Sequence, residues 1–338
     1  MLCPDWSLPG PLLALWPFRM DVWREQARPI QRQLTDFLVQ VQAHQPVLMG
    51  VHPRELSRAS RFLPASIQTV PLRYNDAWPR DIGPVWTQTG AGIQAHDFQF
   101  SAWNGLYPNM AADQTFVREL CARFGWRRQA HQMVLEGGAV CSNGAGVVCW
   151  SRSSIERNNG LNGASSYVRD RLQKSLEKTI NATHHLWFNS TYAADETGGH
   201  IDNMAQFLAP DLLAIDANVL ESDAATLAQL PSSIKILELP PTCSFQPRPN
   251  FFSSVQRRPG VMRRGSQPLL ASYVNFVRTP TAVFVPQFGR ADDAEAVRII
   301  RSAVPYLAVV PVVADEMIAG GGGPHCMTLP LPLLHRPA

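Results

Sequence analysis

Short β-rich runs alternate along this chain with longer segments of helical periodicity, and this alternation is the feature that most constrains its fold. Helical periodicity covers residues 23–45, 113–124, 165–179, 223–230 and 292–303. The β-rich runs are residues 46–51, 146–150, 185–188, 212–216, 234–239, 281–286 and 307–312. Strand and helix alternate about five times, which predicts an α/β fold of roughly 60-residue units, although no clean internal sequence repeat accompanies them.

The composition indicates one globular domain. The 338 residues are 45% hydrophobic and 17% charged, which excludes a disordered or fibrous chain. The 28 prolines are scattered between the periodic segments and never form a linker. We therefore expect a single domain over residues 1–338.

Several functional classes are disfavoured by charge, hydropathy and cysteine pattern. Lys plus Arg number 30 and Asp plus Glu number 27, without a block of five like charges, so no nucleic-acid partner is expected. No apolar stretch reaches the roughly 18 to 20 residues of a spanning helix, so no membrane partner is expected. Residues 1–18 contain Asp5 and interrupting prolines, unlike a secretory signal. The six cysteines include no Cys-x-x-Cys pair, which argues against a disulfide framework, and we predict a cytoplasmic protein.

Four short segments concentrate glycine, acidic, histidine and cysteine residues near predicted strand ends and turns, where a rigid scaffold can present an active site. They are residues 75–84 (NDAWPRDIGP), 135–138 (LEGG), 195–203 (DETGGHIDN) and 320–328 (GGGGPHCMT). Between them they supply one thiol, two histidines and several carboxylates.

Cys326 is the candidate nucleophile of this set. A free thiol is mostly protonated at pH 7 and needs a cation, a histidine or a helix N-terminus to become reactive. Four glycines and His325 precede Cys326, and glycines let the backbone approach a ligand closely. The alternative is a buried structural cysteine after a flexible loop.

His200 and Asp202 are candidates for proton transfer and for holding charge. In an extended segment the side chains of residues i and i+2 point to the same face, so this imidazole and carboxylate would share one site. The alternative is a solvated histidine beside a hydrogen-bonding aspartate.

Several carboxylates around one thiol indicate a cationic substrate. Two acids can bind the two edges of a planar guanidinium through charge-assisted hydrogen bonds, and the bound cation would favour the thiolate. A competing interpretation is a metal site built from Glu136, His200, Asp202, His325 and Cys326. Their spacing matches no standard zinc motif, so we expect no metal.

The four segments, in this order, resemble the agmatine deiminase and bacterial peptidylarginine deiminase family, whose members are guanidine-modifying enzymes of the pentein superfamily. The resemblance spans nearly the whole chain. Further matches are LWP at 15–17, DVW at 21–23, SAWN at 101–104, ASYVNF at 271–276 and VPQFG at 285–289.

This resemblance implies a five-bladed, pseudo-symmetric α/β propeller with the active site on its axis, formed by one catalytic domain. It implies Cys326 as the nucleophile and His200 as the general acid and base. The expected reaction converts agmatine and water to N-carbamoylputrescine and ammonia through a thiouronium on Cys326, without a metal or organic cofactor.

The resemblance also implies which residues contact the guanidino substrate. Asp81 and Asp202 would bind the guanidinium, and Glu136 would either bind it or orient the histidine. Asp76 is a further expected contact. Among Trp78, Trp86 and Trp103, the indole of Trp78 is expected to flank the alkyl chain of the substrate, and the alternative for each of the three is core packing.

Other activities remain compatible with these residues. The alternatives are deimination of arginine or peptidylarginine, amidino transfer, and a catalytically silent protein that binds polyamine-like cations with the same acids. A homo-oligomer is also left open.

Four positions depart from the residues usual in the family, namely Gly198, Asp315, Gly323 and Pro324. We expect these departures to affect recognition of the substrate tail. Residues 248–264 contain five arginines among prolines and aromatic residues and are expected to form a solvated loop, with a lid or an oligomer contact as alternatives.

Overall fold

Five sheets with one shared strand pattern build most of the computed structural model, which describes residues 1–262 and 268–334. In each sheet an antiparallel pair is extended by a strand parallel to its second member. The sheets are β18 (Thr328–Pro330), β1 (Leu12–Leu15), β2 (Val47–Val51) and the additional β3 (Gln68–Pro71); β4 (Val85–Thr89), β5 (Gly92–Gln99) and β6 (Arg128–Val134); β7 (Val140–Ser142), β8 (Val147–Ser151) and β9 (His184–Phe188); β10 (Ala205–Ala209), β11 (Leu212–Asp216) and β12 (Lys235–Leu239); and β15 (Val277–Arg278), β16 (Ala282–Gln287) and β17 (Ala308–Val313).

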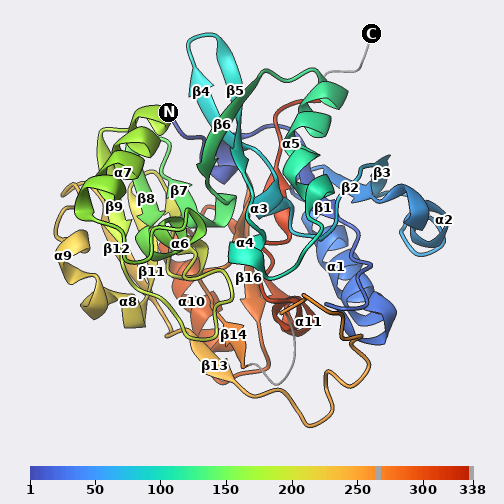
Figure 1. Ribbon diagram of the computed structural model, residues 1–338. Coiled ribbons are helices and arrows are strands. Elements are labelled where there is room, and N and C mark those ends of the chain that lie inside the picture. The colour runs from blue at the N-terminus through green and yellow to red at the C-terminus, as the bar shows by residue number, and fades with distance from the viewer. Residues whose placement is uncertain (263–267, 335–338) are drawn as a thin grey trace.

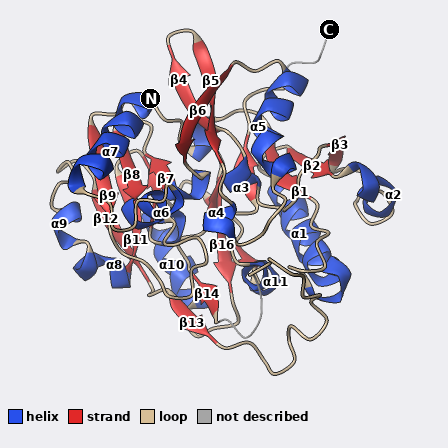
Figure 2. Cartoon of the chain, viewed as in Figure 1, coloured by secondary structure: helices blue, strands red, loops and turns tan. Residues whose placement is uncertain are grey.

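Most helices connect the parallel strands of a sheet, and two short ones connect one sheet to the next. The long ones are α1 (Arg28–Val41), α5 (Ala111–Phe124), α7 (Ser166–Ile180) and α10 (Asp293–Ala303). The short ones are α2 (Leu56–Ala59), α3 (Pro79–Ile82), α4 (Ala102–Gly105), α6 (Arg152–Asn158), α8 (Ala217–Ser222), α9 (Ala224–Leu227) and α11 (Asp315–Gly320). Figures 1 and 2 show α1, α5 and α7 toward the outside of the molecule, and the β4–β5 hairpin projects from its top. A separate two-stranded sheet pairs β13 (Cys243–Phe245) with β14 (Leu269–Ala271).

The long helices pack through one apolar face. In α1 the buried residues Ile30, Leu34, Phe37 and Val41 recur at helical spacing, and Phe37 meets Phe284 of β16 edge to face at 5.7 Å. Each such buried side chain contributes about 1.5 to 3 kcal/mol relative to exposure. This packing fixes the sheets that carry the site.

The predicted alternation of strands and helices is confirmed, and the fold is mixed α/β. The predicted helix over 23–45 is wrong at its start, because Glu25, Gln26 and Ala27 have left-handed φ values of 50°, 58° and 65°. The helix proper begins at Arg28, where Pro29 occupies its first turn. Of the predicted helix over 223–230, the structure retains only α9.

No helix in residues 1–262 and 268–334 is both long enough and apolar enough to cross a lipid bilayer.

Candidate active site

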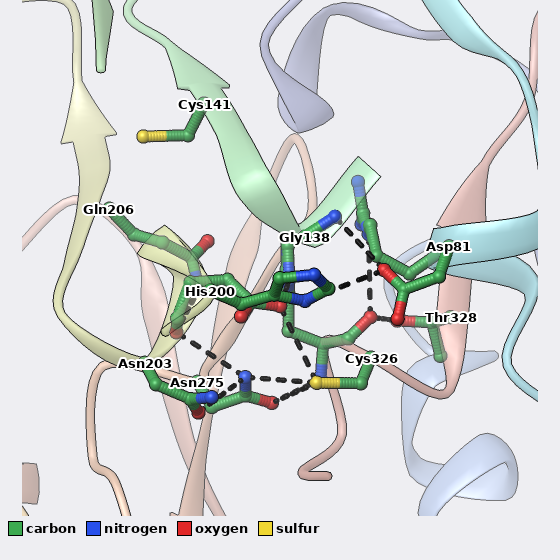
Figure 3. Close-up of polar contacts among 12 residues, drawn as sticks. Asp81, Gly138, Cys141, His200, Asn203, Gln206, Asn275, Cys326 and Thr328 are labelled. Carbon is green, nitrogen blue, oxygen red and sulfur yellow. Dashed lines mark hydrogen bonds and ion pairs between the residues drawn. The ribbon is translucent and has the colours of Figure 1, made fainter. Parts of the chain in front are cut away.

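The predicted catalytic residues lie shortly before the first strand of a sheet. Asp81 is in α3 before β4, Glu136 precedes η4 (Gly137–Ala139) and β7, His200 and Asp202 are at η5 (Ile201–Asn203) before β10, and Cys326 precedes β18. The short helix α3 contacts η4 and β18, and η4 contacts η5. Side chains far apart in the sequence therefore meet in one buried cluster (Figure 3).

His200 is completely buried between two carboxylates. Its Nε2 lies 2.9 Å from Oε2 of Glu136, and its Nδ1 lies 3.7 Å from Oδ1 of Asp81. The imidazole fits because residue 138 is glycine, since a Cβ there would overlap Nδ1 of His200. Burial opposes the charged imidazolium, but Asp81 and Glu136 outweigh it and raise the pKa of His200 to about 10. The imidazole is therefore protonated at neutral pH.

Glu136 is held as a partner of His200. Besides the imidazole, its Oε2 accepts a hydrogen bond of 2.7 Å from Nδ2 of Asn158, and its Oε1 lies 3.5 Å from the hydroxyl of Ser101. Burial raises the pKa of Glu136, against the lowering effect of His200. Of the two roles expected for Glu136, binding the guanidinium or orienting His200, this geometry favours the second.

The Cys326 thiol lies against an acid and an amide. Its Sγ is 3.4 Å from Oδ2 of Asp202, and Nδ2 of Asn275 donates to Sγ at 3.2 Å (Figure 3). Burial, together with the charges of Asp202 and Asp81, raises the pKa of Cys326 well above its usual value. The resting thiol is therefore protonated, and a cation bound beside the acids would lower its pKa.

Behind Asp202, a chain of charged groups leads to the N-terminal segment. Oδ2 of Asp202 is 2.8 Å from Nδ1 of His325, and Nε2 of His325 is 3.1 Å from Oδ2 of Asp5. Arg80 donates to both oxygens of Asp5, at 3.0 and 2.6 Å. Although burial opposes it, the bond from His325 keeps the pKa of Asp202 below its usual value, so Asp202 is ionised.

Two polar atoms of the cluster are left open. Oδ1 of Asp202 and Nδ1 of His200 are buried without a hydrogen-bond partner among the residues that the structure describes. Buried polar atoms normally have hydrogen-bond partners, so two such atoms without partners in one cluster mark a place for a ligand.

Indole rings form a wall beside the acids. Nε1 of Trp103 donates to Oδ2 of Asp81 at 2.9 Å, and Trp78 meets Trp103 edge to face with ring centroids 6.5 Å apart. A Cβ at Gly322 would lie 2.9 Å from both the Trp78 ring and Sγ of Cys326, so this ring and the thiol flank one narrow space. A contact of Trp78 with the substrate stays a prediction.

Trp103 is positioned by an unusual turn. Ala102, Trp103 and Asn104 have left-handed φ values of 53°, 50° and 64°. Such a conformation costs about 1 kcal/mol or more for each non-glycine residue, and it persists only where the surroundings impose it. We interpret the turn as the means by which the indole reaches Asp81.

Asp76 is placed differently from the other predicted contacts. Its Oδ2 lies 3.3 Å from Nη1 of Arg19, and its Oδ1 accepts from the backbone N–H of Ala77 at 2.9 Å. The carboxylate therefore has an arginine partner, and its contact with substrate stays a prediction.

The geometry expected for His200 and Asp202 is wrong in one respect. His200 has extended backbone angles, but it is followed directly by the 3-10 helix Ile201–Asn203, so the two residues are not on one strand face. The helical turn, rather than strand alternation, brings both side chains to the cluster.

The departures from the family pattern lie mainly against the scaffold. A Cβ at Gly198 would meet Arg157, and a Cβ at Gly323 would overlap the carboxamide of Asn275. Asp315 accepts a hydrogen bond from Gln33. An effect of these positions on substrate recognition stays a prediction.

The arginine-containing loop packs on the segment that precedes α1. The backbone N–H of Gln256 donates to the carbonyl of Met20 at 2.7 Å, and that of Met262 donates to Leu106 at 2.8 Å. Arg263 and Arg264 lie outside the described residues. A role of this loop as a lid stays a prediction.

Three residues of the site were missed by reasoning from the sequence. Asn275 lies in the ASYVNF match, but an amide carries no titratable group to draw attention. Asp5 and Arg80 pair across 75 residues, and no local pattern announces that pairing.

No group of three or more His, Cys, Asp or Glu side chains in the described part of the chain is arranged to hold a metal ion.

Replacing Asp5 with asparagine should destabilise the fold most at neutral pH. Against the opposing effect of burial, Arg80 and His325 hold the pKa of Asp5 well below its usual value. Such a carboxylate adds stability above its unfolded pKa of about 3.9 and loses it as the pH falls toward the folded pKa. We expect Asp5→Asn to lower the free energy of unfolding by about 2 to 4 kcal/mol at pH 7.

Urea unfolding at pH 7 and at pH 3 measures this difference, which should shrink at the lower pH. The control Asp36→Asn changes an exposed carboxylate of α1 and should have little effect at either pH. A deficit of Asp5→Asn that is equal at both pH values would contradict the ion-pair explanation.

Comparisons with known proteins agree with this geometry. A family model described as Porphyromonas-type peptidyl-arginine deiminase matches residues 2–332. A protein of Yersinia pseudotuberculosis serotype O:1b (strain IP 31758), provisionally named an agmatine deiminase, is 29% identical over 349 residues, covering 97% of this chain and 94% of its own. The solved agmatine deiminase of Enterococcus faecalis has a TM-score of 0.89 at 25% identity, covering 99% of this chain and 96% of its own. An amidinotransferase from Microseira wollei shares the fold, with a TM-score of 0.55 at 12% identity over 98% and 97% of the two chains. This chain therefore belongs to the Porphyromonas-type peptidyl-arginine deiminase family, as its motifs predicted.

Proposed function

We propose that this protein is a deiminase that hydrolyses agmatine to N-carbamoylputrescine and ammonia, with Cys326 as its nucleophile. The observation that carries the proposal is the buried thiol set among carboxylates, with one acid oxygen left open beside it. The similar proteins named as agmatine deiminases support the choice of substrate.

The charges of the cluster suit a monocationic group. Four carboxylates (Asp5, Asp81, Glu136, Asp202) are linked with three groups that can carry positive charge (Arg80, His200, His325). When all seven groups are ionised, the four negative and three positive charges leave the cluster with a net charge of −1. A guanidinium supplies the balancing positive charge, and its planar edge can donate to the open oxygen of Asp202.

The proposed reaction has two stages. The arriving cation lowers the pKa of Cys326, so the thiol loses its proton to water, and the thiolate attacks the guanidinium carbon, forming a C–S bond. His200 gives its proton to the leaving amino group, the C–N bond breaks, and ammonia departs from a thiouronium. The neutral imidazole then takes a proton from water as its oxygen attacks the same carbon. The C–S bond breaks, which regenerates the thiolate, and the remaining hydroxyl proton passes through water to the departed ammonia, which leaves the neutral carbamoyl product and ammonium.

The roles proposed for the other residues follow from their contacts. Asp81 and Asp202 bind the guanidinium, and Glu136 keeps His200 oriented and charged. Trp78 flanks the alkyl chain, and Asp76 is a further contact of the substrate. Burial of Cys326, which is 5% exposed, favours a small free guanidine over an arginine within a polypeptide.

We also propose that the five similar sheets are the blades of a five-bladed propeller, in one catalytic domain over residues 1–338. The repeated strand pattern supports this arrangement, as does the placement of site residues before first strands. A cytoplasmic location, a homo-oligomeric state and the absence of nucleic-acid and membrane partners stay predictions.

Ammonia release from a panel of guanidines tests the proposed function. We expect turnover of agmatine to exceed that of arginine and of an amide-blocked arginine peptide. A preference for arginine or for the peptide would favour the alternative deiminases. Binding of agmatine without any ammonia release would favour the silent cation-binding protein, and transfer of the amidino group to an added amine would favour amidino transfer.

Treatment with a chelator should leave the turnover of agmatine unchanged. Attack by a thiolate requires no Lewis acid, and His200 supplies and removes the protons. The measurement is ammonia release before and after dialysis against EDTA. Loss of activity that added zinc restores would revive the metal interpretation.

A further inference from the structure

A cavity of about 50 Å³ lies on the side of the catalytic cluster covered by the N-terminal segment. Its walls come from that segment and from the strands β4, β7, β10 and β15. The lining residues that matter here are Cys3, Trp6, Trp86, Ser142, Gln206 and Arg278. Figure 3 labels Gln206 and also Cys141, another lining residue, on the strands beside His200. We call this space the Arg278 cavity.

Arg278 brings an uncompensated positive charge to this cavity. Its residue is only 7% exposed, its Nε donates to the carbonyl of Leu208 at 3.1 Å, and its guanidinium lies 5.4 Å from the ring centroid of Trp6. Nη1 is buried without a hydrogen-bond partner in the described residues, and no carboxylate among them lies within ion-pair distance. Burial lowers the pKa of Arg278 to about 10, so the group still carries its charge at pH 7.

Two other arginines with little exposure, the buried Arg80 and the half-buried Arg19, have carboxylate partners. Arg80, which lines the same cavity, is bound by Asp5 through two hydrogen bonds. Arg19 is paired with Asp21 and Asp76. A buried guanidinium without a counter-ion is costly, so the exception at Arg278 points to a missing anion.

A second residue of the wall also carries an unpaired donor. Trp86 lines the cavity, and its indole Nε1 is buried without a partner in the described part of the chain. The carboxylate of Asp5 is the one acid in the wall, and its charge is offset by Arg80 and His325. The wall of the cavity therefore contains unpaired N–H donors and an excess of positive charge.

We propose that the Arg278 cavity binds one small monovalent anion, either a halide or a small carboxylate. One water molecule needs about 10 to 15 Å³ measured in this way, so the volume holds such an ion with a few waters and excludes larger anions. The planar guanidinium suits both kinds of anion. Because Trp6 covers Arg278, the anion also ties the N-terminal segment to β15.

Thermal unfolding in different anions tests this proposal. Tm is measured as chloride or formate replaces gluconate at constant ionic strength, since gluconate is too large for the cavity. The wild-type protein should gain about 2 °C when the small anion reaches ten times its dissociation constant. A response to chloride alone, or to formate alone, identifies the kind of anion.

Arg278→Met should remove that gain, because methionine keeps the apolar stem and lacks the charge. The matched control is Arg290→Met, which changes an exposed arginine stacked 4.9 Å from the ring of Phe245. This control should respond to chloride as the wild type does. Equal responses of Arg278→Met and the wild type would overturn the proposal.

Crystals of the wild-type protein grown in bromide provide a test that needs no variant. We expect an anomalous peak within hydrogen-bond distance of Nη1 of Arg278. The absence of a peak there would overturn the proposal. A peak without any anion-dependent Tm would mean binding at crystal concentration only, and would overturn it as well.

Discussion

Replacing Cys326 with alanine should abolish ammonia release from agmatine while agmatine still binds. The thiol supplies the bond-forming electrons of the proposed reaction, whereas the acids around it supply the attraction for the cation. Loss of a nucleophile that acts together with its partners lowers turnover by about 10⁴-fold or more. Turnover is measured by ammonia release, and binding is measured by calorimetry with the same substrate.

Cys121→Ala is the matched control for that experiment. Cys121 is also a buried thiol, and burial raises its pKa to about 12, but it lies in the apolar face of α5. This variant should lose some stability and keep its turnover. A Cys326→Ala protein that retains a sizeable fraction of wild-type turnover would contradict the role of Cys326.

The strands that the sequence predicted are those with long apolar runs. Residues 212–216 form β11 with the expected bounds, and residues 46–51 contain β2. Both lie in the interior of their sheets, where continuous hydrophobic segments are buried on both faces. The physical cause of their burial is thus visible in the sequence itself.

The first strands of the sheets were not predicted. β15 spans two residues, Val277–Arg278, and β18 spans Thr328–Pro330 and ends in a proline. Periodicity needs a longer window than these strands provide. Their position depends on pairing with the strand that follows, which is a tertiary effect. In the sequence, residues of the catalytic cluster come shortly before these strands.

The candidate site could be predicted where chemistry is concentrated in short motifs. Motif residues such as His200 and Cys326 were named from the sequence, and the structure brings them together. Asn275 and Asp5 could not be predicted, because one is an uncharged amide and the other meets His325 from the opposite end of the chain. Contacts of that kind depend on how segments far apart in the sequence pack together rather than on any local pattern.

Neutralising Asp202 should lower the turnover of agmatine and at the same time quicken alkylation of Cys326. The lost charge weakens the binding of the guanidinium by about 1.5 to 3 kcal/mol, which corresponds to about tenfold to 150-fold. In the free protein, Asp202 opposes the thiolate that lies beside it. Its removal lowers the pKa of Cys326, so a larger fraction of the thiol reacts with a neutral reagent such as chloroacetamide.

Of the two variants Asp202→Asn and Asp81→Asn, the first disturbs fewer hydrogen bonds of the folded protein. Oδ2 of Asp202 accepts from His325 and Oδ1 has no partner, so an asparagine keeps the first contact and places its amide at the open position. Asp81 accepts N–H groups on both oxygens, from Trp103 and from Gly138. An amide at position 81 must therefore face a donor, and Asp81→Asn should lose stability in addition to turnover.

The control that separates charge from folding is Asp223→Asn. Asp223 is also a buried acid whose two oxygens accept backbone N–H groups, from Asn189 and Ser190, but it does not contact the catalytic cluster. It should lose stability as Asp81→Asn does, without quicker alkylation of Cys326. Opposite changes in alkylation and turnover at positions 81 and 202 distinguish a substrate clamp from acids of the scaffold. If both rates fall together in variants that remain folded by circular dichroism, Asp81 and Asp202 serve the fold, and the guanidinium must be bound elsewhere.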